Sequence, residues 1–138
     1  MNSIEVNNIT RSRIDLSLIK KVTQAFLKNY KIKNKEVSIA LVGDKRIKDL
    51  NKAYRSKDQV TDVLAFPGED EFLGEIIINY AQIKRQAKKF SKCTREELIF
   101  ILVHGLLHLL GYTDKTENDR EKMLKLAENF IKYPNYKL

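Results

Sequence analysis

The sequence is poor in residues that cross-link chains or span membranes. One of its 138 residues is a cysteine, which excludes a disulfide framework and fits a reducing compartment. No apolar run reaches the ~18 residues of a transmembrane helix, because the longest, residues 98–110, contains His104, Gly105 and His108. The N-terminus lacks the basic and apolar segments of a signal peptide, so we expect a cytoplasmic protein without a membrane partner.

Glycine, proline and tryptophan are also scarce, with five, two and no residues. The chain therefore has no Gly/Pro-rich linker, and it has no internal repeat, so we expect one domain over residues 1–138. The hydrophobic fraction of 43% excludes a disordered chain. The net charge of +8 is typical of a protein that binds a polyanion, usually nucleic acid, although a lysine-rich surface also serves solubility.

Apolar periodicity and capping residues predict an α+β fold, with a small mixed sheet of about four strands and about five helices. The expected strands are residues 3–7, 37–42, 61–66 and 72–78, and the expected helices are residues 15–30, a short helix from 44, and residues 79–90, 94–110 and 116–133. Gly74 lies inside the last strand, where it predicts a bulge or the close approach of another group.

The helix expected over residues 94–110 is apolar on most of its sides. That pattern predicts a buried central helix. Thr94 and Glu97 have the spacing of a capping box at its start, and Gly111 is the residue type that ends a helix.

His104 and His108, the only histidines, lie one turn apart on this helix, where both rings can bind one metal ion. Gly111 then turns the chain back, so that Asp114 can supply a third ligand, a spacing similar to that of metzincin motifs. Three protein ligands and an open position form a catalytic zinc site. The alternative is a pair of core histidines that are hydrogen-bonded to carbonyl groups.

Gly105 follows the first histidine, at the position where zinc peptidases of the His-Glu-x-x-His type have their general base. The missing carboxylate disfavours a peptidase. It favours a reaction in which hydroxide on the metal, or the substrate itself, is the nucleophile.

Two basic residues, Arg55 and Lys57, flank the turn before the third expected strand. Arginine can bind a phosphate through two parallel hydrogen bonds, so this turn is a candidate phosphate site. A solvated basic loop is the alternative.

Three segments of the chain resemble the YbeY-type endoribonucleases, the bacterial rRNA maturation factors. They are His104-Gly105-Leu106-Leu107-His108-Leu109-Leu110-Gly111-Tyr112, then Leu50-Asn51 through Tyr54-Arg55, Lys57 and Thr61-Asp62-Val63-Leu64 to Phe66-Pro67, and Leu73-Gly74-Glu75-Ile76 with Glu75 where aspartate is common.

The resemblance implies a single-metal hydrolase that cleaves single-stranded RNA, acts in 16S rRNA 3′-end maturation and ribosome quality control, and works on the small ribosomal subunit without a small-molecule cofactor. It implies an α+β fold with a central metal helix. His104, His108 and Arg55 would be catalytic, Arg55 and Lys57 would contact RNA, and His104, His108 and Asp114 would bind Zn²⁺.

The chain departs from this family at the third ligand. The family's motif continues Gly-Tyr-Asp-His, whereas this chain has Gly-Tyr-Thr-Asp, so Asp114 takes the place of the last histidine. A carboxylate lowers the net charge of the site by one, and harder divalent ions then compete better with zinc. Two other functions stay open: a non-catalytic rRNA-binding assembly factor with a structural zinc and, less favoured, a zinc peptidase.

Overall fold

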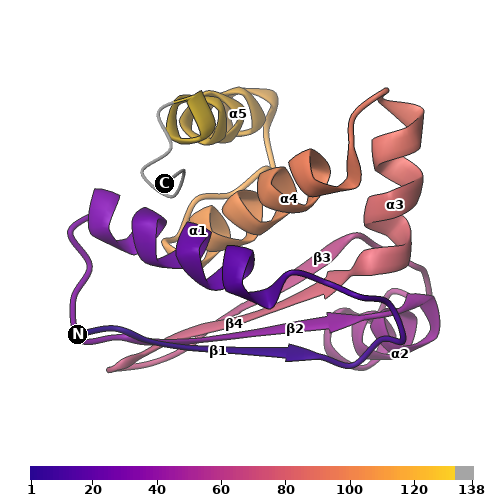
Figure 1. Ribbon diagram of the computed structural model, residues 1–138, viewed down its shortest axis with the longest axis horizontal. Helices are drawn as coiled ribbons and strands as arrows, with labels where there is room; N and C mark the ends of the chain where they lie inside the picture. Colours follow the sequence, from indigo (N-terminus) through magenta and orange to yellow (C-terminus); the bar gives the residue numbers. More distant parts are fainter. Residues whose placement is uncertain (133–138) are drawn as a thin grey trace.

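A computed structural model describes residues 1–132, which form layers of helices around a four-stranded sheet (Figure 1). In chain order the elements are β1 (Ser3–Asn8), α1 (Leu16–Asn29), β2 (Glu36–Val42), α2 (Asp44–Arg55), β3 (Val63–Pro67), β4 (Phe72–Asn79), α3 (Tyr80–Lys89), α4 (Thr94–Leu109) and α5 (Glu117–Lys132). This order confirms the predicted α+β fold. The end predicted for the last helix, at residue 133, lies outside the described residues.

The sheet has the strand order β1-β2-β4-β3 and is mixed, because β1, β2 and β4 run parallel and β3 pairs antiparallel with β4. Alternate residues of a strand point to opposite faces. Ala65 and Ile76 accordingly belong to the main core beneath α1 and α4, whereas Leu64 and Ile77 pack with Ile47 of α2 on the other face. The sheet is thus covered on both faces.

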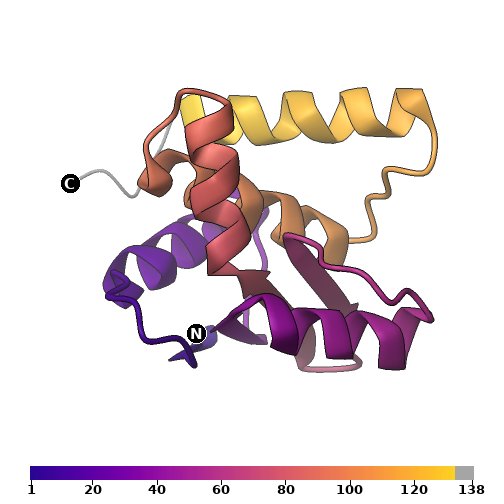
Figure 2. The ribbon, with the colours of Figure 1, turned by 90° about the vertical axis from the view of Figure 1, so that its right-hand side faces the viewer.

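Helix α4 is the central helix, as predicted. Leu102 and Leu106 are fully buried, and α4 packs against the sheet on one side and against α1, α3 and α5 on the others (Figure 2). An apolar surface on every side of the helix is stable only in such an enclosed position. Within residues 1–132, none of the helices has both the length and the apolar composition needed to cross a bilayer.

The start of α4 differs from the prediction by one residue. The N-cap is Cys93, and the carboxylate of Glu96 accepts a hydrogen bond from the Cys93 backbone N–H at 3.1 Å. The capping box predicted for Thr94 and Glu97 is therefore wrong. Glu97 is instead buried and accepts a hydrogen bond from Gln86 of α3 at 2.8 Å, because the neighbouring helix offers a partner that local spacing does not reveal.

Gly74 is both a bulge residue and a site of close approach. The register of β2 and β4 shifts beside it, and its φ of +149° is one that other residues rarely adopt. A Cβ there would lie 2.5 Å from the carbonyl oxygen of Phe66 and 2.6 Å from Leu109 Cδ2. The approaching groups are thus the chain's own atoms, and they seat the end of α4 on the sheet.

Candidate metal centre

Two imidazoles project from the same face of α4. His104 and His108 lie one turn apart, their ring centroids are 4.7 Å apart, and the rings are nearly perpendicular at 82°. Each side chain is 24% exposed, so the pair lies at the edge of the core with one side open to solvent. This geometry follows directly from the i, i+4 spacing on a regular helix.

The turn after α4 brings a carboxylate to the two rings. Gly111 adopts a φ of +100°, its N–H donates to the carbonyl of His108 at 3.0 Å, and the N–H of Tyr112 donates to the carbonyl of Leu107 at 3.2 Å. This arrangement is a glycine C-cap of the kind predicted. It places Asp114 Oδ2 3.7 Å from His104 Nε2 and 3.8 Å from His108 Nε2.

The three donors fit one divalent cation. Their ligand atoms all lie within 4.8 Å of one another. Tetrahedral zinc with bonds of ~2.0–2.1 Å separates its ligand atoms by roughly 3.3 Å. Asp114 Oδ2 would therefore have to approach each imidazole nitrogen by about half an ångström, and the most widely separated donor atoms would have to approach by up to about 1.5 Å. The Asp114 side chain is 50% exposed, which leaves that side of the group open to a water molecule or a substrate.

A backbone carbonyl orients one of the rings. His108 Nδ1 lies 3.0 Å from the carbonyl oxygen of Tyr112, which directs Nε2 of the same ring toward Asp114. Metal-binding histidines usually donate their second N–H to such an acceptor, which sets the tautomer. The sequence analysis missed this role for Tyr112, whose signal is its place directly after the turn glycine.

Burial and nearby charges set the protonation of the group. Burial of the ring lowers the pKa of His104 below its ordinary value of 6.5, and repulsion from His108 lowers it further, while Asp114 and Asp62 act in the opposite direction. A lowered pKa keeps the ring neutral at neutral pH. A neutral imidazole is the form that binds a metal.

The glycine between the two histidines faces the sheet. A Cβ at Gly105 would lie 2.9 Å from Ile76 Cγ2 and 3.4 Å from Val63 Cγ2. A glutamate at this position, as in the His-Glu-x-x-His peptidases, would therefore meet packed β4 and β3 side chains. The geometry agrees with the sequence in disfavouring a peptidase.

A buried asparagine at the start of α3 holds the loop before β3, a role that is not among the sequence predictions. Asn79 is fully buried, and its Nδ2 donates to the carbonyl of Thr61 at 3.2 Å and to Asp44 Oδ1 at 2.7 Å. Its backbone N–H donates to the carbonyl of Asp62 at 2.8 Å. Hydrogen bonds from Arg85, which have the larger effect, and from Asn79 hold the pKa of Asp44 below its usual range. The network fixes the loop whose Asp62 charge acts on His104.

The structure does not join the predicted phosphate-binding residues to the histidines. Arg55 is the last residue of α2, Lys57 lies in the loop that follows, and both are exposed. Across residues 1–132, no hydrogen bond or ion pair connects either side chain with His104, His108 or Asp114. The loop does lead to Val63, which packs beside Gly105, so its far end lies against α4.

Comparison with known proteins gives a consistent assignment. The family described as Endoribonuclease YbeY matches residues 2–134. A curated Endoribonuclease YbeY of Thermodesulfovibrio yellowstonii is 40% identical over 94% of this chain and 95% of its own length, and that of Sulfurihydrogenibium sp. is 37% identical over 89% and 86%. The solution structure of a Thermotoga maritima protein, 28% identical, matches 91% of this chain and 87% of its own with a TM-score of 0.62.

Proposed function

This chain belongs to the endoribonuclease YbeY family, and on that premise we propose that it is a metal-dependent endoribonuclease that cleaves single-stranded RNA in 16S rRNA 3′-end maturation and ribosome quality control. Residues 1–138 act as one catalytic domain, and the small ribosomal subunit is the partner. The observation that supports the metal dependence is the convergence of two imidazoles and one carboxylate.

His104, His108 and Asp114 hold the cation, which we propose is zinc, with other divalent ions as competitors. When bound, the cation would act as a Lewis acid toward the scissile phosphate and would make a nucleophile available at neutral pH. The Tyr112 carbonyl keeps the His108 ring in its binding orientation. With two neutral rings and one carboxylate, a divalent ion retains a net charge of about +1, which still attracts an RNA phosphate.

Arg55 binds the scissile or an adjacent phosphate, and Lys57 holds the RNA backbone. Two features support these roles: both cations are exposed, and neither has a side-chain hydrogen bond or ion pair within residues 1–132 that would compete with a ligand. Ser56 between them adopts a left-handed conformation with a φ of 57°, which ends α2 and turns the loop. The planar guanidinium can bind a phosphate through two hydrogen bonds at this turn.

The test combines metal analysis with RNA cleavage by the full chain. We expect bound metal in the purified protein, cleavage of single-stranded RNA, loss of cleavage with chelator and no cleavage of casein. Asp114→Ala should lower metal affinity and cleavage by more than the roughly 10- to 100-fold that loss of an orienting partner costs. Glu117→Ala, which removes one exposed carboxylate from the same segment, should change neither.

Arg55→Ala should lower cleavage by roughly 100-fold or more while the metal content stays constant, and Arg55→Lys should restore only part of it. Arg11→Ala removes the same charge from an exposed position outside the site and serves as the control. A protein that holds metal and binds rRNA but never cleaves it would contradict the proposal and favour the non-catalytic assembly factor.

A further inference from the structure

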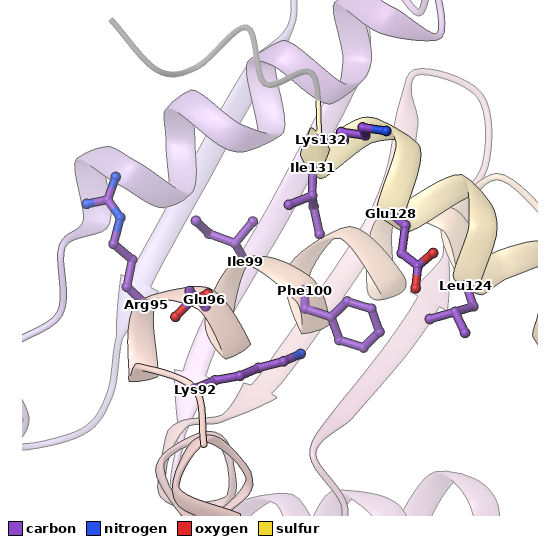
Figure 3. Close-up of a pocket in the computed structure, with 9 residues that line it drawn as sticks. All are labelled: Lys92, Arg95, Glu96, Ile99, Phe100, Leu124, Glu128, Ile131 and Lys132. Atoms are coloured by element: carbon purple, nitrogen blue, oxygen red, sulfur yellow. The ribbon is translucent and has the colours of Figure 1, made fainter. Parts of the chain in front are cut away.

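A pocket lies next to the candidate metal centre, between the first half of α4 and the second half of α5. Its volume is about 680 Å³. The apolar part of its lining comes from both helices: Ile99, Phe100, Leu124 and Ile131. In Figure 3 the Phe100 ring projects from α4 toward Leu124 and Glu128 of α5.

Phe100 connects this pocket with the metal-binding group. It precedes His104 by one helical turn, and the centroids of the two rings are 6.4 Å apart. Lys92 lies on the pocket side, with its Nζ 4.8 Å from the centroid of the Phe100 ring and 3.4 Å from Glu97 Oε1. A cation just before α4, an aromatic ring and a candidate metal-binding ring therefore follow one another in this order along the chain.

We propose that this pocket is a nucleotide subsite, in which a base of the single-stranded RNA next to the cleavage site stacks on Phe100. The inference rests on the proposed function, because it assigns a place to one nucleotide of that substrate. Bases of every kind have an aromatic face, so stacking on such a platform recognises single strands without demanding a sequence. A duplex, whose bases are already stacked, gains nothing from it.

The charges around the pocket favour RNA and orient it. Three cations line the pocket, Lys92, Arg95 and Lys132, against two carboxylates, Glu96 and Glu128. The Glu96 carboxylate is already engaged at the helix start, where it accepts the Cys93 N–H. Glu128 faces Phe100 from α5 and would repel a phosphate. Lys92 is paired with Glu97, so Arg95 is the cation at the start of α4 that suits the RNA backbone, whereas the apolar pocket interior suits the base.

The experiment tests whether the Phe100 side chain and a single RNA base contribute to binding through the same contact. Binding of a labelled single-stranded RNA of about ten nucleotides is measured with metal-free protein, so that no cleavage interferes. Phe100→Leu should weaken binding roughly 5- to 100-fold, the effect of losing one stacked base, whereas Phe100→Tyr should bind like the wild type. The control is Phe90→Leu, because Phe90 is a 54% exposed ring with Lys89 Nζ 5.8 Å from its centroid and does not line the pocket.

A series of RNAs that each lack one base makes the test specific. One abasic position should weaken binding to the wild type and to Phe90→Leu, yet cause no further loss with Phe100→Leu. Unfolding midpoints and metal content, measured for each variant, separate a folding defect from a binding defect. An equal abasic penalty in wild type and Phe100→Leu would overturn the subsite, and so would an absence of RNA binding by the wild type.

Two other results have clear meanings. If Phe100→Leu abolishes self-association of the protein while RNA binding is unchanged, the pocket joins two copies of this chain and the subsite is wrong. If the base and Phe100 are coupled but the loaded wild type never cleaves RNA, the proposed catalytic function fails and the subsite stands. If the wild type cleaves RNA normally but the base and Phe100 are not coupled, the subsite is wrong and the proposed catalytic function stands.

Discussion

Replacing Gly105 with alanine sets helix propensity against packing at the centre of the metal helix. In a helix interior, alanine is favoured over glycine by about 1 kcal/mol. The new Cβ, however, would lie 2.9 Å from Ile76 Cγ2, well inside the normal carbon–carbon contact of ~3.5–4.0 Å. Ile76 is fully buried and β-branched, so this methyl group cannot easily rotate away. Overpacking of a core costs about 1–3 kcal/mol, so we expect a net destabilisation of about 1 kcal/mol.

Guanidinium unfolding followed by circular dichroism measures this difference, with metal-free protein because bound metal would add its own stabilisation. Ile76→Ala removes the contacting methyl group and provides the matched background. In that background Gly105→Ala should stabilise the protein by up to about 1 kcal/mol, which makes the two substitutions strongly non-additive. If Gly105→Ala stabilises the otherwise wild-type protein, or if the two effects simply add, the packing argument is wrong.

Three other predictions concern the same helix and its ligands. Leu102→Ala should cost about 2–5 kcal/mol in thermal or denaturant unfolding, because this side chain is fully buried; a loss below 1 kcal/mol would contradict the central position of α4. The pKa of His104 in the folded protein is lowered below 6.5, so between pH 6.5 and that lowered pKa the unfolded chain binds more protons than the folded one. Metal-free protein should therefore lose stability as the pH falls through this window, and His104→Gln should reduce the loss. Asp114→His raises the charge of the site by one and should shift metal preference from manganese or magnesium toward zinc in competition assays; an unchanged preference would argue against Asp114 as a ligand.

The sequence predicts the grouping of His104, His108 and Asp114 because all of its parts are local. His104 and His108 share a face by the geometry of any α-helix, and Gly111 stops that helix wherever it packs. Asp114 follows so closely that the chain has few ways to place it elsewhere. The apolar pattern of α4 likewise requires burial, whatever surrounds it.

Periodicity and spacing could not predict contacts between segments that are distant in the sequence. The N-cap of α4 is Cys93, with Glu96 as its partner, and Glu97 instead accepts a hydrogen bond from Gln86 of another helix. Asn79 has the pattern of an ordinary N-cap, yet burial makes it bind Asp44 and the loop before β3 as well. Such partners depend on which elements are neighbours in space.

The sequence by itself determined the elements, the central helix and the three candidate ligands, since each depends on residues within a few turns of one another. Tertiary structure alone decided that Gly105 lies against Ile76 and that Phe100 lines a pocket beside His104. The physical reason is that packing brings side chains together from strands and helices far apart in the chain, and no local pattern encodes which of them will meet.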